Sequence, residues 1–160
     1  MATMTFDPLG YGGVAPLSII GPGEMFWWDK NGVIEPALRL NTPEPDHHWR
    51  VVHFPKGKLP KYVEHDPADQ RFFLLAGGAR WRVDGIPSGP VATSGEAAGT
   101  IRVGASSGEA ILCASSSQGV VRIDLKTYEV TLQALRRAPF KHWAVGVMDV
   151  NGDFFSFYKR

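Results

Sequence analysis

The sequence predicts an all-β protein, and three observations carry that prediction. The 160 residues include 18 glycines and 12 prolines, which lie between short apolar runs and leave little room for long helices. Apolar and polar residues alternate in several of these runs, as side chains do on a strand with one buried face. Asn-Gly pairs at residues 31–32 and 151–152 are typical of tight hairpins. We therefore expect many short strands joined by turns.

The chain is long enough for one domain with an N-terminal extension, since domains commonly contain about 100 to 200 residues. Residues 1–23 are rich in glycine and proline, which favours an irregular segment with one short strand over residues 17–20. We expect an arm over residues 1–23 that packs across the rest of the fold or across a neighbouring chain. Residues 24–160 are then a single β-domain.

The first half of this domain is expected to begin with a hairpin, formed by residues 25–28 and 33–34 around the turn at 29–32. A polar loop with two prolines follows over residues 41–46. Alternation of Trp81 and Val83 with two arginines indicates a strand with one buried and one wet face. The expected strands after the hairpin cover residues 49–54, 61–65, 71–76 and 79–83.

The second half begins with a segment rich in Gly, Ser, Ala and Pro over residues 87–99, which we interpret as a long loop. Val121, Ile123 and Leu125 alternate with polar residues, a pattern of period two that predicts a strand. A last hairpin is expected to turn at residues 149–152. The expected strands cover residues 100–103, 110–114, 120–125, 128–135, 143–148 and 154–158, and helix is confined to residues 134–138.

The charge balance argues against a nucleic-acid partner. Seventeen Lys and Arg face sixteen Asp and Glu, which leaves a formal net charge of +1. No basic block is present that would neutralise a row of phosphates. We expect no nucleic acid among the partners of this protein.

The single cysteine and the first residues of the chain indicate the cellular compartment. Cys113 has no partner for an intramolecular disulfide, and its apolar neighbours indicate a buried thiol rather than a reactive one. Residues 1–6 lack the basic start and apolar run of a secretory signal, and no window approaches the roughly 18 apolar residues of a membrane span. These features predict a cytoplasmic protein with no membrane partner.

The segment from Gly57 to Gly77 carries the most specific pattern in the chain. Between these glycines, Val63, His65 and Gln70 have the spacing of the first cupin motif, in which two histidines and a glutamate occupy those positions. The residues around the motif also resemble cupins over about 37 residues. The resemblance implies a cupin-like jelly-roll barrel of two antiparallel sheets, with the arm and the Trp-rich hairpin at the interface of a homodimer.

A second cupin motif is matched more loosely between residues 99 and 111, with one extra residue. Counting from Gly108, Ile111 takes the place of the last metal-binding histidine of the family. The resemblance therefore aligns the four metal-ligand positions with Val63, His65, Gln70 and Ile111. Valine and isoleucine donate nothing to a metal and neutral glutamine is a weak ligand, so we expect no metal and no other cofactor.

What is left of this site suits an organic ligand better than a metal ion. Val63 and His65 are two apart on an expected strand and should point to the same inward face. We expect a small-molecule pocket in which His65 and Gln70 provide polar contacts, with His53 beside them. The expected apolar wall is formed by Val63, Trp81 and Ile111, although most of the tryptophans are expected to serve packing, which leaves Trp81 or Trp49 for the pocket.

Two other functions stay open. The first is a metal-dependent oxygenase or isomerase whose ligands have moved to His53 or His142, or to a set of His53, His65 and one further donor. His47 and His48 are weaker candidates because adjacent residues on an extended chain face opposite ways. For His65 itself two roles stay open: a general acid or base, or a histidine that remains from the lost metal site and is only hydrogen-bonded at the mouth of the barrel. The second is a structural or assembly protein that reuses the barrel.

Overall fold

The structure is a computed structural model that describes residues 13–43, 48–91 and 96–160. Within these ranges the fold is all-β, with thirteen strands and no helix. No segment of the described chain is therefore a helix that could cross a membrane. The strands are β1 (Val14–Pro16), β2 (Glu24–Lys30), β3 (Val33–Arg39), β4 (Trp49–His53), β5 (Lys61–His65), β6 (Phe72–Gly78), β7 (Arg80–Asp84), β8 (Ile101–Val103), β9 (Ala110–Ser116), β10 (Gly119–Asp124), β11 (Glu129–Val130), β12 (His142–Met148) and β13 (Phe154–Lys159).

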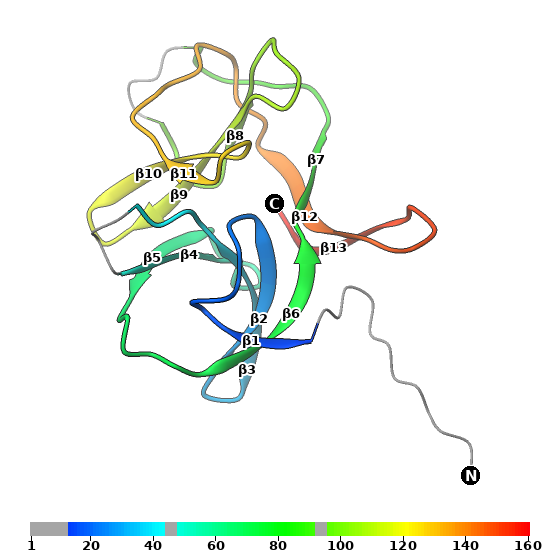
Figure 1. Ribbon diagram of the computed structural model, residues 1–160. Helices are drawn as coiled ribbons and strands as arrows, with labels where there is room; N and C mark the ends of the chain where they lie inside the picture. Colours follow the sequence, from blue (N-terminus) through cyan, green and yellow to red (C-terminus); the bar gives the residue numbers. More distant parts are fainter. Residues whose placement is uncertain (1–12, 44–47, 92–95) are drawn as a thin grey trace.

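Ten strands form one large curled sheet and three form a second sheet. The large sheet has the order β1-β6-β2-β3-β4-β5-β9-β10-β11, with β8 paired to β9, and the small sheet has the order β13-β12-β7. Strands β2 to β5 follow one another, and β6 then returns to pair with β2, which is a Greek-key connection. All pairings are antiparallel except the short contact of β5 with β9. Figure 1 shows β2 to β6 curving around the segment that follows β1.

The first hairpin is confirmed and its register follows from its turn. Asn31 and Gly32 form a two-residue loop with φ values of 54° and 83°, the positive angles that suit the twist of a hairpin. The Gly32 amide donates to the Asp29 carboxylate over 2.8 Å. With this loop length, Trp28 lies directly opposite Glu35 on the neighbouring strand. The last hairpin, β12 and β13, is confirmed as well.

Two hydrophobic clusters use opposite faces of the same strands. On β2, Met25 belongs to the first cluster, whereas Phe26 and Trp28 belong to the second, as alternation along a strand requires. We call the first cluster the main core: Met25, Leu38, Leu40, Val52, Phe54, Ala76, Ala79, Ile101, Leu112, Ala114, Ile123, Leu125, Trp143, Val145 and Tyr158. We call the second cluster the concave core: Ala15, Leu17, Ile20, Phe26, Trp28, Ala37, Val51 and Phe73.

The described part of the expected arm is built into this sheet. Residues 13–23 contain β1, which pairs with β6, and Leu17 and Ile20 are buried in the concave core. The strand expected over residues 17–20 is wrong, because the strand ends at Pro16 and a turn follows it. In that turn, the Ile19 and Ile20 amides donate to the Pro16 carbonyl. Residues 1–12 lie outside the described ranges.

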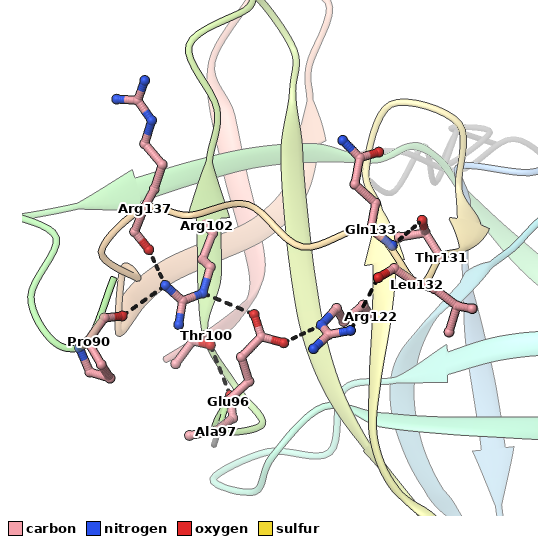
Figure 2. A network of polar contacts seen from close by, with 10 residues as sticks. All are labelled: Pro90, Glu96, Ala97, Thr100, Arg102, Arg122, Thr131, Leu132, Gln133 and Arg137. Carbon is pink, nitrogen blue, oxygen red and sulfur yellow. Dashed lines mark hydrogen bonds and ion pairs between the residues drawn. The ribbon is translucent and has the colours of Figure 1, made fainter. Parts of the chain in front are cut away.

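A buried ionic network holds the described parts of the long connection, residues 87–91 and 96–99, against β8 and β10 (Figure 2). The Arg102 guanidinium lies 3.1 Å from the Glu96 carboxylate, and these side chains are only 2% and 4% exposed. The same carboxylate binds Arg122. Arg102 also donates to the carbonyls of Pro90 and Arg137. The described residues of the segment form no strand, as expected for a loop, but their position is determined by these contacts.

Two expectations for the region after β10 are wrong. The strand expected over residues 128–135 is reduced to Glu129–Val130, and residues 134–138 form no helix. The Gln133 amide donates to the Thr131 hydroxyl, and the Arg137 carbonyl accepts from the buried Arg102. The first contact is local and the second is tertiary, and both occupy backbone groups that a strand or helix would need. The buried position of Cys113 is confirmed, with no exposure to solvent.

Candidate functional site

A cluster of polar and aromatic side chains lies at one end of the face that carries the concave core. Alternation brings residues from five strands to this face, and the curl of the sheet brings those strands around it. All of its members line one open groove. We call this set the histidine site: Trp28 and Lys30 from β2, Glu35 from β3, His53 from β4, Lys61, Val63 and His65 from β5, Arg71 just before β6, and Phe73 within it.

The centre of the site is a direct contact between two histidines. Nε2 of His53 lies 2.9 Å from Nε2 of His65, within hydrogen-bond distance. The two residues are not opposite each other in the strand ladder, since His53 pairs with Lys61 and His65 pairs with Trp49. The rings meet because the strands curve and both side chains reach along the concave face.

An aromatic stack supports His65 from below. The rings of His65 and Trp28 are stacked with centroids 4.3 Å apart, and Trp28 is stacked on Phe73 at 4.6 Å. Trp28 also meets His53 edge-on at 5.0 Å. Trp28 is 5% exposed, so its ring is held by packing and forms a flat surface that positions both imidazoles.

A carboxylate lies behind the histidine pair. Oε1 of Glu35 is 3.1 Å from Nδ1 of His53, and the Glu35 side chain is 14% exposed. The two atoms are close but not aligned for a hydrogen bond, so Nδ1 is buried without a hydrogen-bond partner among the described residues. His53 as a whole is only 6% exposed. An unsatisfied polar atom at this depth costs stability, which marks the site as more than a packing arrangement.

The neighbours of His53 determine where its proton lies. A lone pair on Nδ1 would face the carboxylate of Glu35, so the neutral ring carries its proton on Nδ1 and accepts at Nε2. His65 must then donate from its own Nε2 across the 2.9 Å contact. Nδ1 of His65 is left as an acceptor for a group that enters the groove.

Both imidazoles are held neutral near pH 7. The pKa of His53 is lowered to about 3, mainly by burial and to a smaller extent by the charges of His65, Lys30 and Lys61. Burial also lowers the pKa of His65, where Asp69 acts in the opposite direction and Arg71 and Lys30 act with burial.

Cations surround the pair on the groove side. Arg71 lies over the Trp28 ring, 4.8 Å from its centroid, and makes a 2.7 Å ion pair with Asp69. Lys30 and Lys61 lie close enough to His53 to depress its pKa. The site therefore combines neutral imidazoles, a flat aromatic floor and positive charge at its edge.

The groove is large and open, with a volume of about 2000 Å³. Small-molecule pockets usually enclose about 300 to 1000 Å³, so a small ligand would fill only a part of it. The histidine site is the part with buried polar groups. Other stretches of the lining come from the β2–β3 turn, from residues 54–58 and from β13.

The structure divides the residues that the sequence singled out. Val63, His65 and His53 line the groove together. Gln70 is exposed in the connection between β5 and β6 and is absent from the lining. Trp81 packs against the main core, with its ring centroid 5.8 Å from that of Trp143, and Ile111 is buried within β9.

The four positions aligned with cupin ligands therefore do not converge on one centre. Only Val63 and His65 lie in the groove. Among the described residues, no group of three His, Cys, Asp or Glu side chains is arranged to hold a metal ion. His142 is exposed on β12, in the other sheet, 3.4 Å from the Arg160 carbonyl. His48 is exposed, and His47 lies outside the described residues.

Sequence reasoning missed Glu35, Trp28 and Arg71 as members of the site. For Glu35 and Trp28 the signal was available, since a two-residue turn at 31–32 places residues 28 and 35 opposite each other. Nothing in the sequence indicates that Trp28 meets His65, because β2 and β5 are separated by two strands in the sheet. That contact depends on the curl.

No protein-family model, curated protein or solved structure matches this chain. The site is therefore interpreted from its own geometry and chemistry.

Proposed function

We propose that this protein binds a small organic molecule at the histidine site, without a tightly bound metal. The observation that carries the proposal is the pair of His53 and His65, which meets at 2.9 Å beneath an open groove. A purely structural core would fill this space with apolar side chains, since buried unsatisfied nitrogens are costly. Perturbed titratable groups in a cleft are typical of functional sites.

The chemistry of the site suits recognition by a few polar contacts on an apolar surface. Nδ1 of His65 offers an acceptor, Val63 and Phe73 offer apolar contact, and Arg71 and the lysines offer donors. Ligand sites commonly combine such a largely apolar lining with a small number of placed polar groups. Gln70, Trp81 and Ile111 are not part of this proposal because they do not line the groove.

We also propose that the scaffold is a cupin-like jelly roll whose metal site has been lost. The spacing from Gly57 to Gly77 supports this scaffold. Both glycines have positive φ angles, 70° and 104°, which glycine adopts more readily than other residues. The Greek-key return of β6 is compatible with such a barrel.

A fragment screen by NMR tests the binding function. We expect small water-soluble aromatic compounds to shift the indole N–H of Trp28 and the backbone amides of β5. In His65→Phe, the ring can remain stacked on Trp28 while both nitrogens are lost. The affinity measured from these shifts should then decrease by at least about tenfold. His142→Phe is the matched control, since it changes an exposed histidine outside the groove.

Two results would overturn the proposal. One is a screen in which no compound shifts these resonances, which would favour a structural or assembly role. The other is a stoichiometric metal bound at His65 after incubation with zinc, nickel, manganese or iron salts, which would favour the metal-dependent enzyme.

A further inference from the structure

The groove carries an excess of positive charge, although the chain as a whole is nearly neutral. The chain has 17 basic and 16 acidic residues, and its formal net charge is only +1. The groove is lined by six cationic side chains but by only Asp29 and Glu35 on the acidic side. The cationic residues are Lys30, Lys56, Lys58, Lys61, Arg71 and Lys159. A cleft with charge of one sign focuses its field on a ligand of the opposite sign.

Two of these cations are placed at the histidine pair and have no carboxylate of their own. Lys61 is the direct cross-strand neighbour of His53, and Lys30 lies two residues beyond Trp28 on the same face of β2. Neither lysine forms an ion pair with a carboxylate of the described chain, whereas Arg71 is paired with Asp69. The lysine charges are thus available to a ligand.

The remaining surface beside them is apolar. Val63 lines the groove on the strand between Lys61 and His65, and Phe73 lines it on the same face of β6. A ligand that satisfies the whole site needs an acidic group for the lysines and an apolar body for these side chains. A neutral molecule would leave the lysine charges without a counterion.

We propose that the ligand is a small organic acid, whose carboxylate or phosphate lies between Lys30 and Lys61 and whose apolar body rests on Val63 and Phe73. This inference rests on the proposed binding function and names the class of ligand for the same groove. Two cations can contact two oxygens of one acidic group. An amine is disfavoured, because it would meet positive charge on both sides.

Four compounds with the same ring and different charge test the proposal: phenyl phosphate, benzoate, benzamide and benzylammonium. Affinities are measured by calorimetry, and the site by the NMR shift of the Trp28 indole. We expect the two acids to bind about tenfold more tightly than benzamide, and benzylammonium to bind most weakly. Raising the salt from about 0.02 M to about 0.3 M should weaken only the acids, because salt screens exposed charges.

Variants assign the effect to the two lysines. The double substitution of Lys30→Gln and Lys61→Gln should remove the advantage of the acids and leave benzamide unchanged. Lys126→Gln is the control, since Lys126 is exposed in the turn after β10 and does not line the groove.

The outcomes separate the ligand class from the binding function. If benzamide or benzylammonium shifts Trp28 as strongly as benzoate does, the acidic class is wrong and the binding function stands. If the acids keep their advantage in the double variant, the placement at Lys30 and Lys61 is wrong. If none of the four compounds shifts Trp28, the acidic class is wrong, and the fragment screen then decides the binding function by itself.

Discussion

At the scale of the residue, the site depends on two imidazoles held neutral and in contact. His53 lies between the Glu35 carboxylate on one side and His65 on the other, at 3.1 and 2.9 Å. Trp28 supports both rings. This arrangement orients the proton on His53 and leaves an acceptor on His65 that faces the groove. The chain maintains it although the buried Nδ1 of His53 has no hydrogen bond in the described structure.

The low pKa of His53 makes stability depend on pH. The folded pKa is about 3 and the ordinary value is 6.5, so between these pH values the unfolded chain binds a proton that the folded one does not. Stability from this group is complete above pH 6.5 and falls as the pH decreases toward 3. The charged groups that face His53 are Glu35 on β3, Lys30 on β2, and Lys61 and His65 on β5.

We predict that the free energy of unfolding decreases by about 3 kcal/mol more between pH 7 and pH 4 in the wild type than in His53→Gln. Glutamine keeps a polar group of similar size but does not titrate. Urea unfolding at each pH, followed by circular dichroism, measures the difference. Parallel pH profiles for the two proteins would show that His53 has an ordinary pKa in the folded state.

At the scale of the element, a β-bulge shapes the small sheet. The register of β12 and β13 shifts between Val145 and Gly146, which brings the backbone of β13 close to Gly146. A Cβ atom built on Gly146 would lie 1.7 Å from the Phe155 carbonyl oxygen. The close approach of two strands, rather than an unusual φ angle, requires glycine at this position.

We predict that Gly146→Ala destabilises the protein by about 2 to 4 kcal/mol, because the strands must separate to admit a methyl group. Gly78→Ala is the matched control, since a Cβ on this exposed strand glycine meets nothing within 4 Å. The control should be neutral or slightly stabilising, because alanine restricts the unfolded chain. Thermal unfolding of the two variants compares them, and equal midpoints would contradict the prediction.

At the scale of the whole molecule, the curl of the large sheet assembles the site from strands that do not pair with each other. β2 and β5 are separated by β3 and β4 in the sheet, but Trp28 and His65 stack. The sheet ends at β1, whose outer edge pairs with no other strand of the described chain. Around it, Val14 and Ile19 are 59% and 71% exposed. Exposed apolar side chains at a sheet edge are typical of an interface.

We predict a homodimer that joins two copies at the β1 edge. Ile19→Glu should shift the mass in sedimentation equilibrium from dimer to monomer, because a charge would be buried at the interface. Leu132→Glu is the control, since Leu132 is 93% exposed and lies after β11. A wild-type protein that stays monomeric across the concentration range, or an Ile19→Glu variant that stays dimeric, would contradict this interface.

The sequence by itself determined the all-β class, both Asn-Gly hairpins and the burial of Cys113, because local alternation and turn chemistry encode them. It did not determine the course of residues 128–138, where Arg102 and Thr131 occupy the backbone groups. For the site, Val63 and His65 were placed on a common face by alternation alone. The meeting of His65 with His53 and Trp28 was decided only by the tertiary structure, since the distance between non-adjacent strands depends on how far the sheet curls.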